Sequence, residues 1–282
     1  MGYDKLVDSS HLDASLATIA DAIRTKGGTS ASLAFPDGFV SAVEAIPTGG
    51  AETSWLAFFT GDLSLSSDQI VYSGPSVSGK SLNGQKNVKT ISFPYVKTLR
   101  DGNSYYRFAN MTNLEKFEAP LAEYVDDYML YNCVNLRIVN FQSLLDSANG
   151  LLEKTNVEVV VLPSIKTVYA RAFRDVTSLR VFDGLILTGF TNQNNFNGCA
   201  NFDTLIIRKS DGVASLANIN NFTGTPFASG GSGGTLYVPS ALIASYQSAT
   251  NWSTILGYAN NQILSIEGSI YETQYADGTP IT

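Results

Sequence analysis

One stretch of the chain has the residue types and the spacing that bind phosphate. Residues 74–81 read GPSVSGKS and match the G-x-x-x-x-G-K-[ST] pattern, in which backbone N–H groups and a lysine hold the phosphates of a nucleotide. That chemistry needs a strand before the loop and a helix after it. The segment DQIVYS before the loop is typical of a strand, but Leu82, Asn83 and Gly84 predict a turn where the helix should begin. We therefore interpret the match as a glycine- and serine-rich loop and expect no ATP binding.

The other side chains that could do chemistry are few. Glycoside hydrolysis needs two carboxyl groups roughly 5 to 9.5 Å apart across a sugar-binding cleft. Glu123, Asp126 and Asp127 are close in sequence, but the sequence specifies no partner for them, and we interpret them as solvated surface charge. His11 is the single histidine, and without a partner it supports neither a metal site nor a catalytic triad. We expect no catalytic residue, no metal site and no cofactor.

The composition narrows the class of partner. Of the 282 residues, 44% are hydrophobic, which is enough for a core, and only 15% are charged. The net charge of −7 argues against a basic surface for nucleic acid or anionic membrane. The chain has no run of 18 apolar residues, and its N-terminus lacks the apolar segment of a secretory signal. We expect no nucleic-acid partner, no membrane insertion and no signal peptide.

A repeat of about 22 residues runs through the middle of the chain. Each unit begins with a small polar residue followed by an apolar one, and the units start at Asn87, Asn113, Asn135, Asn156, Ser178 and Asn201. The offsets between these residues are 26, 22, 21, 22 and 23. Such regular spacing falls within the range of leucine-rich repeats.

Within a unit the apolar residues follow an L-x-x-L-x-L pattern, as in Leu114, Phe117 and Ala119. One unit cannot bury its apolar face alone, so neighbouring units stack with parallel strands about 4.8 Å apart. The charge after the first apolar residue alternates in sign from unit to unit, through Lys89, Glu115, Arg137, Glu158, Arg180 and Asp203. This order supports the register, because adjacent strands would place opposite charges side by side. The pattern predicts a repeat solenoid.

The repeats resemble the BspA-like class of leucine-rich repeats. The resemblance rests on LPSIKTVYARAFRDVTSLRVF at 162–182, where an apolar-Pro step leaves the strand and an F-x-x-C-x-x-L run leads into the next unit. FANMTNL at 108–114 and FNGCANF at 196–202 repeat that run, whereas the third unit departs from it with Lys154 at the small buried position. The segment 225–255, with its YVP and NW landmarks, resembles the end of such arrays. The resemblance implies a parallel β-sheet with a back side of loops and short helices.

Four regions follow from this interpretation. Residues 1–48 form an N-terminal helical module and linker, 49–86 a degenerate cap repeat, 87–210 the repeat array, and 211–282 a C-terminal cap and tail. The first region has amphipathic helical spacing that ends at Gly27 and Gly28. It resembles a short module of phage and prophage tail proteins of Gram-positive bacteria, and an ordinary helical hairpin that caps the array is the alternative.

The repeat register makes a prediction about the two cysteines. Cys133 and Cys199 occupy equivalent positions three repeats apart, which corresponds to about 14 Å at parallel-strand spacing. A disulfide needs Cα atoms within about 7 Å of each other. We expect both thiols to be reduced and buried.

Binding is expected on the outward face of the sheet, because alternate strand residues must point away from the core. The apolar outward residues Ile138, Val159, Val161, Val181 and Ile206 would form a stripe, unless a loop or another subunit covers them. The candidate binding residues are Lys116, Glu118, Ile138, Asn140, Val159, Val161, Val181 and Asp183. A second group, which could stack on sugars or fill the back of the repeats, consists of the loop residues Tyr105, Tyr106, Tyr124, Tyr128 and Tyr131.

These observations predict a non-enzymatic binding or structural protein. The resemblance of the N-terminal region favours a phage or prophage tail-associated protein that meets a bacterial surface protein or glycan through its repeat face. Such a protein would be located in a virion or outside the cell and could form a homo-oligomer. A bacterial cell-surface adhesin with the same repeats is the alternative, and a carbohydrate-degrading tail protein is a further one.

Overall fold

The computed structural model describes residues 63–66, 69–72, 82–100, 105–191 and 193–281, with side chains from Leu82 onward. The chain divides into two compact units, 1–57 and 58–282. The predicted N-terminal module, His11 and the phosphate-loop match at 74–81 lie outside the described residues. Directly after that match the chain forms a turn, with Gly84 at φ 78°, and residues 82–89 contain no helix, as expected for a loop.

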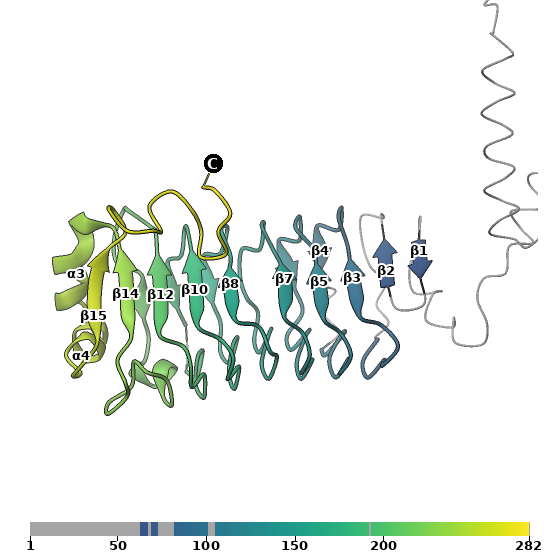
Figure 1. Cartoon of the computed structure of the whole chain (residues 1–282), viewed down its shortest axis with the longest axis horizontal. Helices are drawn as coiled ribbons and strands as arrows, with labels where there is room; N and C mark the ends of the chain where they lie inside the picture. Colours follow the sequence, from purple (N-terminus) through teal and green to yellow (C-terminus); the bar gives the residue numbers. More distant parts are fainter. Residues whose placement is uncertain (1–62, 67–68, 73–81, 101–104, 192, 282) are drawn as a thin grey trace, which may run out of the picture. The chain divides into compact units, whose positions relative to one another are not determined.

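Two five-stranded sheets form the front of the second unit (Figure 1). All neighbouring strands pair in parallel, except for the antiparallel pair at the N-terminal end. The first sheet contains, in spatial order, β1 (Leu63–Ser66), β2 (Gln69–Tyr72), β3 (Thr90–Ser92), β5 (Lys116–Glu118) and β7 (Ile138–Asn140). The second contains β8 (Val159–Val161), β10 (Val181–Gly184), β12 (Thr204–Ile207), β14 (Thr235–Val238) and β15 (Gln262–Ser265).

The strands have the register that the repeat predicted. Phe117 of β5 lies between Ile91 of β3 and Val139 of β7, so equivalent residues of successive repeats are neighbours. Backbone hydrogen bonds also join members of the alternating charge series within each sheet, for example from Glu115 N to the Lys89 carbonyl at 2.8 Å. The predicted parallel pairing of repeats is therefore confirmed, and the fold is a repeat fold built on parallel sheets.

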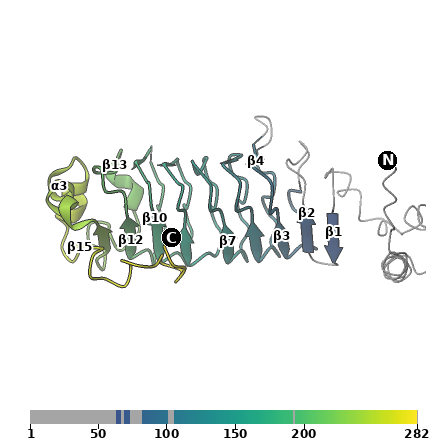
Figure 2. The same cartoon turned by 90° about the horizontal axis from the view of Figure 1, so that it is seen from above.

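Shorter strands run along the opposite side of the core (Figure 2). They form a two-stranded and a three-stranded parallel sheet, made of β4 (Thr98–Leu99) with β6 (Tyr124–Val125), and of β9 (Thr167–Val168), β11 (Gly189–Phe190) and β13 (Ser215–Leu216). Aromatic rings fill the space between front and back, as in the stacked pair Phe196 and Phe202, whose ring centroids lie 4.3 Å apart. Full burial of such a side chain contributes about 1.5–3 kcal/mol, so the core supplies most of the driving force for folding.

Most back-side turns in the described part of the chain use two left-handed residues four positions apart, such as Tyr106 and Asn110. One column of such residues contains Asn110, Asn132, Lys154, Asp175, Gly198 and Gly224. Lys154, with φ 61°, therefore belongs to the turn, and its ammonium group donates to the Tyr131 hydroxyl at 3.1 Å. Thr155 fills the small buried position instead, with its hydroxyl donating to the Leu152 carbonyl at 2.8 Å. The predicted departure at Lys154 is wrong by one residue, because this repeat is one residue shorter.

Short helices follow the last repeats. They are η2 (Ile219–Phe222), η3 (Ser240–Leu242), α3 (Ile243–Ser248) and α4 (Trp252–Leu256). Two side chains of α3 and α4 hold Ala214: the Tyr246 hydroxyl accepts from its N–H at 3.0 Å, and the Trp252 indole donates to its carbonyl at 2.6 Å. None of the helices in the described part of the chain is long and apolar enough to cross a membrane.

The two cysteines are free and buried, as predicted. The Cys133 thiol donates to the Phe108 carbonyl at 3.1 Å, and the Cys199 thiol makes the equivalent bond to Phe173 at 2.9 Å. Each bond reaches the preceding repeat, so the thiols tie neighbouring repeats together. Burial raises the pKa of both thiols to about 12.

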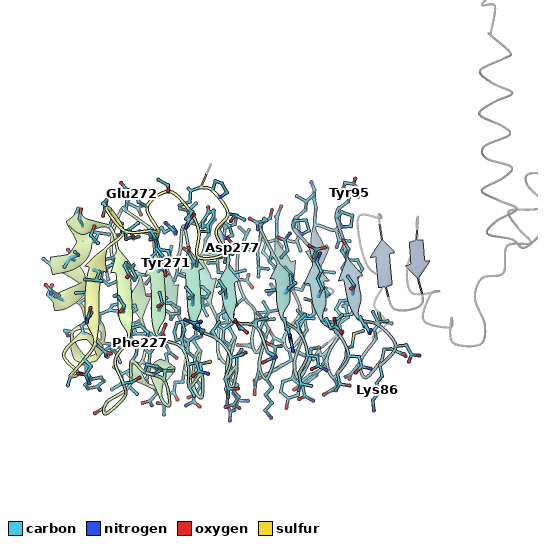
Figure 3. All side chains as sticks on the ribbon, viewed as in Figure 1. Lys86, Tyr95, Phe227, Tyr271, Glu272 and Asp277 are labelled. Atoms are coloured by element: carbon cyan, nitrogen blue, oxygen red, sulfur yellow. The ribbon has the colours of Figure 1, made fainter. Side chains whose placement is uncertain are left out.

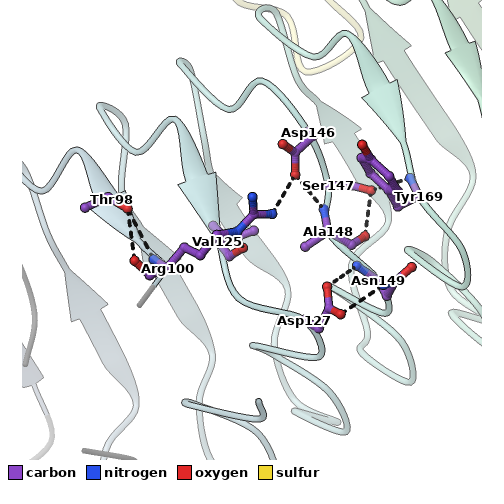
Figure 4. A network of polar contacts seen from close by, with 9 residues as sticks. All are labelled: Thr98, Arg100, Val125, Asp127, Asp146, Ser147, Ala148, Asn149 and Tyr169. Atoms are coloured by element: carbon purple, nitrogen blue, oxygen red, sulfur yellow. Dashed lines mark hydrogen bonds and ion pairs between the residues drawn. The ribbon is translucent and has the colours of Figure 1, made fainter. Parts of the chain in front are cut away.

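The two front sheets meet at a junction between β7 and β8, where the strand pairing stops. At the back-side turns the repeats on either side of this junction stay joined, because Leu130 N donates to the Leu151 carbonyl at 3.1 Å and Asn132 N to the Glu153 carbonyl at 2.9 Å. Polar side chains bridge the repeats near this junction (Figure 4). They include an ion pair between Arg100 and Asp146 at 3.1 Å. The front ladder is thus interrupted here while the turns stay hydrogen-bonded, and the short back-side strands likewise form two separate sheets.

Candidate functional site

The outward face of the front sheets carries two rows of side chains. The register places one row at the first residue of each strand and the other at the third. The first row runs through Thr90, Lys116, Ile138, Val159, Val181, Thr204 and Thr235. The second runs through Ser92, Glu118, Asn140, Val161, Asp183, Ile206 and Tyr237. All eight candidate binding residues lie in these two rows, and their role in binding stays a prediction.

The outward side chains of the strands from β3 to β8 are half-buried, apart from that of Ile138, which is exposed. Ile138 is the most exposed apolar residue of the rows, at 54%. On β5, Lys116 and Glu118 form an ion pair with each other at 3.0 Å, and the Asn140 side chain accepts a hydrogen bond from Gln142 at 3.1 Å. This open face therefore combines an exposed isoleucine with polar groups that already have partners within the chain.

The valines beside Ile138 are half-buried. Val159 and Val161 belong to β8, and Val181 pairs directly with Val159 in the neighbouring strand. Together with Ile138 they form an apolar centre that continues across the junction. Such a centre with polar neighbours is the arrangement in which interfaces concentrate binding energy.

From β10 onward the C-terminal tail covers the second row (Figure 1). Asp183 and Ile206 were expected to be exposed, but both are fully buried. The Ala276 amide donates to the Asp183 carboxylate at 2.9 Å, which brings the tail directly over this row. The expected exposure is wrong for these two residues, because a segment more than 60 residues later in the chain folds back onto their strands.

Asp183 is held in a buried ion pair. The Arg208 guanidinium donates to both carboxylate oxygens, at 2.7 and 2.8 Å. Burial raises the pKa of Asp183, and the hydrogen bond from Arg208 only partly offsets this effect. Sequence reasoning missed Arg208 because it lies just beyond the L-x-x-L-x-L pattern, where a charged residue reads as ordinary surface.

Three of the five loop tyrosines form a cluster, and the other two lie apart from it. Tyr106 and Tyr128 stack with ring centroids 5.0 Å apart, and Tyr131 meets Tyr106 edge-on at 5.7 Å. These three rings stack on one another at the back-side turns, where Tyr106 is still 37% exposed, so both roles expected for them stay predictions. Tyr124 belongs to strand β6 and not to a loop, and its ring lies 5.7 Å from the Arg100 guanidinium. Tyr105 is exposed at 63%.

The acidic residues near these tyrosines have structural partners. Asp126 is buried and accepts two hydrogen bonds from Arg107, at 2.9 and 3.1 Å, so the expectation that it is solvated is wrong. Asp127 accepts from the backbone and side-chain amides of Asn149, both at 2.9 Å. Across the residues that the structure describes, no group of three histidine, cysteine or acidic side chains could hold a metal ion.

A comparison with solved structures found one that is similar to this chain. It is the crystal structure of a leucine-rich repeat protein from Bacteroides ovatus ATCC 8483, which is similar to this chain with 22% sequence identity and a TM-score of 0.41. The match covers 50% of this chain and 37% of the other, so this chain spans about a third of that protein. No family model matches the sequence, and no curated protein matches it.

Proposed function

We propose that this protein is a BspA-like leucine-rich repeat solenoid that binds without catalysis. Its partner would be a bacterial surface protein or glycan, and its setting a phage or prophage tail. The observation that carries the proposal is the open outward face from β3 to β8, where Ile138 and the valines of β8 form an apolar centre among polar residues. The resemblance of residues 1–48 to a module of tail proteins supports the setting.

The proposal is tested with a variant that changes only the open face. Ile138→Asp combined with Val159→Asp places two charges in the apolar centre, and neither residue belongs to the core of the repeats. We expect the full-length variant to lose at least 90% of its binding to a panel of Gram-positive cells and to a glycan array. Val134→Asp is the matched control, since Val134 is 45% exposed but precedes the strand on a turn.

Circular dichroism and the thermal midpoint establish that both variants are folded. If the folded double variant still binds, the open face is not the recognition surface. The tyrosines on the back-side turns would then be tested next. Equal loss in the Val134→Asp control would show that the assay reports general surface charge and not a defined face.

A further inference from the structure

The end of the chain forms a strap, residues 268–281, that lies on the outward face of the second sheet. It leaves β15 through Gly268 at φ 79° and crosses over β14, β12 and β10 (Figure 1). Figure 3 shows Tyr271 and Asp277 of the strap in front of these strands. The strap therefore covers one part of the outward face and leaves the part from β3 to β8 open.

The sheet holds the strap through one pair of charged side chains. Arg208 donates to the Tyr271 carbonyl at 2.5 Å and to the Gln274 carbonyl at 2.9 Å. Asp183 accepts from the Ala276 amide at 2.9 Å. All three hydrogen bonds end on main-chain atoms of the strap, so this pair recognises the course of a backbone and not particular polar side chains.

Aromatic side chains supply the sequence-dependent contacts. The Tyr271 ring meets Tyr237 of β14 edge-on, with centroids 4.9 Å apart. The Tyr275 ring lies 5.2 Å from the Arg208 guanidinium, within the range of a cation–π contact. A peptide that satisfies this surface thus needs two aromatic residues four positions apart, as in the strap sequence YETQYA.

The strap is built as a separate layer. It pairs with itself, through hydrogen bonds from Tyr275 N to the Thr279 carbonyl at 2.8 Å and from Ile281 N to Thr273 at 3.1 Å. Among the described residues, no strand pairing joins it to the sheets. The inward residues of the covered strands, such as Phe182 and Leu205, are buried on the other face of the sheet, so removing the strap opens no hole in the core.

We propose that Asp183, Arg208 and Tyr237 form a peptide-binding site and that the strap is its resident, displaceable ligand. The site takes a short polypeptide turn that offers two carbonyls, one amide and two aromatic rings in the spacing of the strap. This site is separate from the open face of the proposed function. A partner carrying such a turn competes with the strap and gains access to β10 and β12.

The test uses the full-length chain and a labelled synthetic peptide of residues 268–281. Tyr271→Ser with Tyr275→Ser weakens the strap and leaves the site unchanged. We expect this strap variant to bind the peptide at least tenfold more tightly than the unaltered protein, whose own strap competes at high effective concentration. Adding Arg208→Gln to the strap variant should abolish binding, whereas adding Arg137→Gln, an exposed arginine beside the first sheet, should not.

Two results would overturn the proposal. One is a folded strap variant that does not bind the peptide, and the other is peptide binding that is unaffected by Arg208→Gln. A second measurement uses the unaltered protein. It compares the hydrogen-exchange rate of the Ala276 amide with the rates of the strand amides of β12. We expect the Ala276 amide to exchange at least a hundredfold faster, and equal rates would show that the strap opens only with the fold.

Discussion

The buried thiols make the free energy of unfolding depend on alkaline pH. Burial raises the pKa of Cys133 and Cys199 from the ordinary value of 9.0 to about 12. Between these two values the thiols ionise in the unfolded chain but stay protonated in the folded one. Raising the pH therefore stabilises the unfolded state, so the contribution is absent below pH 8 and grows as the pH passes 9.

The magnitude follows from linkage. At pH 10, ionisation of a thiol with pKa 9.0 stabilises the unfolded chain by RT ln(1 + 10), which is about 1.4 kcal/mol. A folded thiol with pKa about 12 stays protonated, so ionisation stabilises the folded state by almost nothing. Each cysteine should thus lower the free energy of unfolding by about 1.4 kcal/mol between pH 7 and pH 10. Cys199→Ala removes one such contribution, together with a packing term that does not depend on pH.

The assay is urea unfolding at pH 7 and pH 10 with a reductant, on the unaltered protein and on Cys199→Ala. The expected result is a loss of stability between the two pH values that is smaller in the variant by about 1.4 kcal/mol. An identical pH dependence in both proteins would refute the reasoning, because it would mean that the Cys199 thiol ionises equally well in both states.

Two further predictions concern single contacts. Arg107→Met leaves the buried Asp126 carboxylate without this partner and should lower the free energy of unfolding by about 3–5 kcal/mol, and adding Asp126→Leu should restore more than half of the loss in urea titrations. Gly150→Ala places a Cβ 2.2 Å from the Tyr128 ring at φ 59° and should cost about 1–3 kcal/mol. Gly84→Ala, at φ 78° with open space around it, isolates the backbone part of that cost, and an equal loss in both variants would contradict a clash with Tyr128.

The repeat register could be predicted because the residues within each unit determine it. Each unit places apolar residues at fixed distances, and Phe117 and Phe182 point inward as their position in the unit requires. The alternating charges gave an independent check of the register. The backbone N–H groups of Glu115 and Arg180 donate to the carbonyls of Lys89 and Glu158, the residues that precede them in the series. Pattern reasoning works here because neighbouring repeats are also neighbours in space.

Features that depend on distant or irregular segments could not be predicted in the same way. The burial of Asp183 results from Ala276, 93 residues later, which no repeat pattern connects to it. The junction between β7 and β8 coincides with the 21-residue offset, but a spacing shorter by one residue does not indicate which strands lose their pairing. A faint signal was Ser147, a buried polar residue where neighbouring repeats have Val125 and Val168.

The junction has a consequence for how the fold comes apart. In a repeat protein, folding passes from unit to unit through nearest-neighbour coupling, and the weakest coupling sets where cooperativity fails. The repeats that contain β7 and β8 share back-side hydrogen bonds but no front ladder, so their coupling is the weakest along this array. The array should melt as two blocks, with Cys133 reporting on the first and Cys199 on the second.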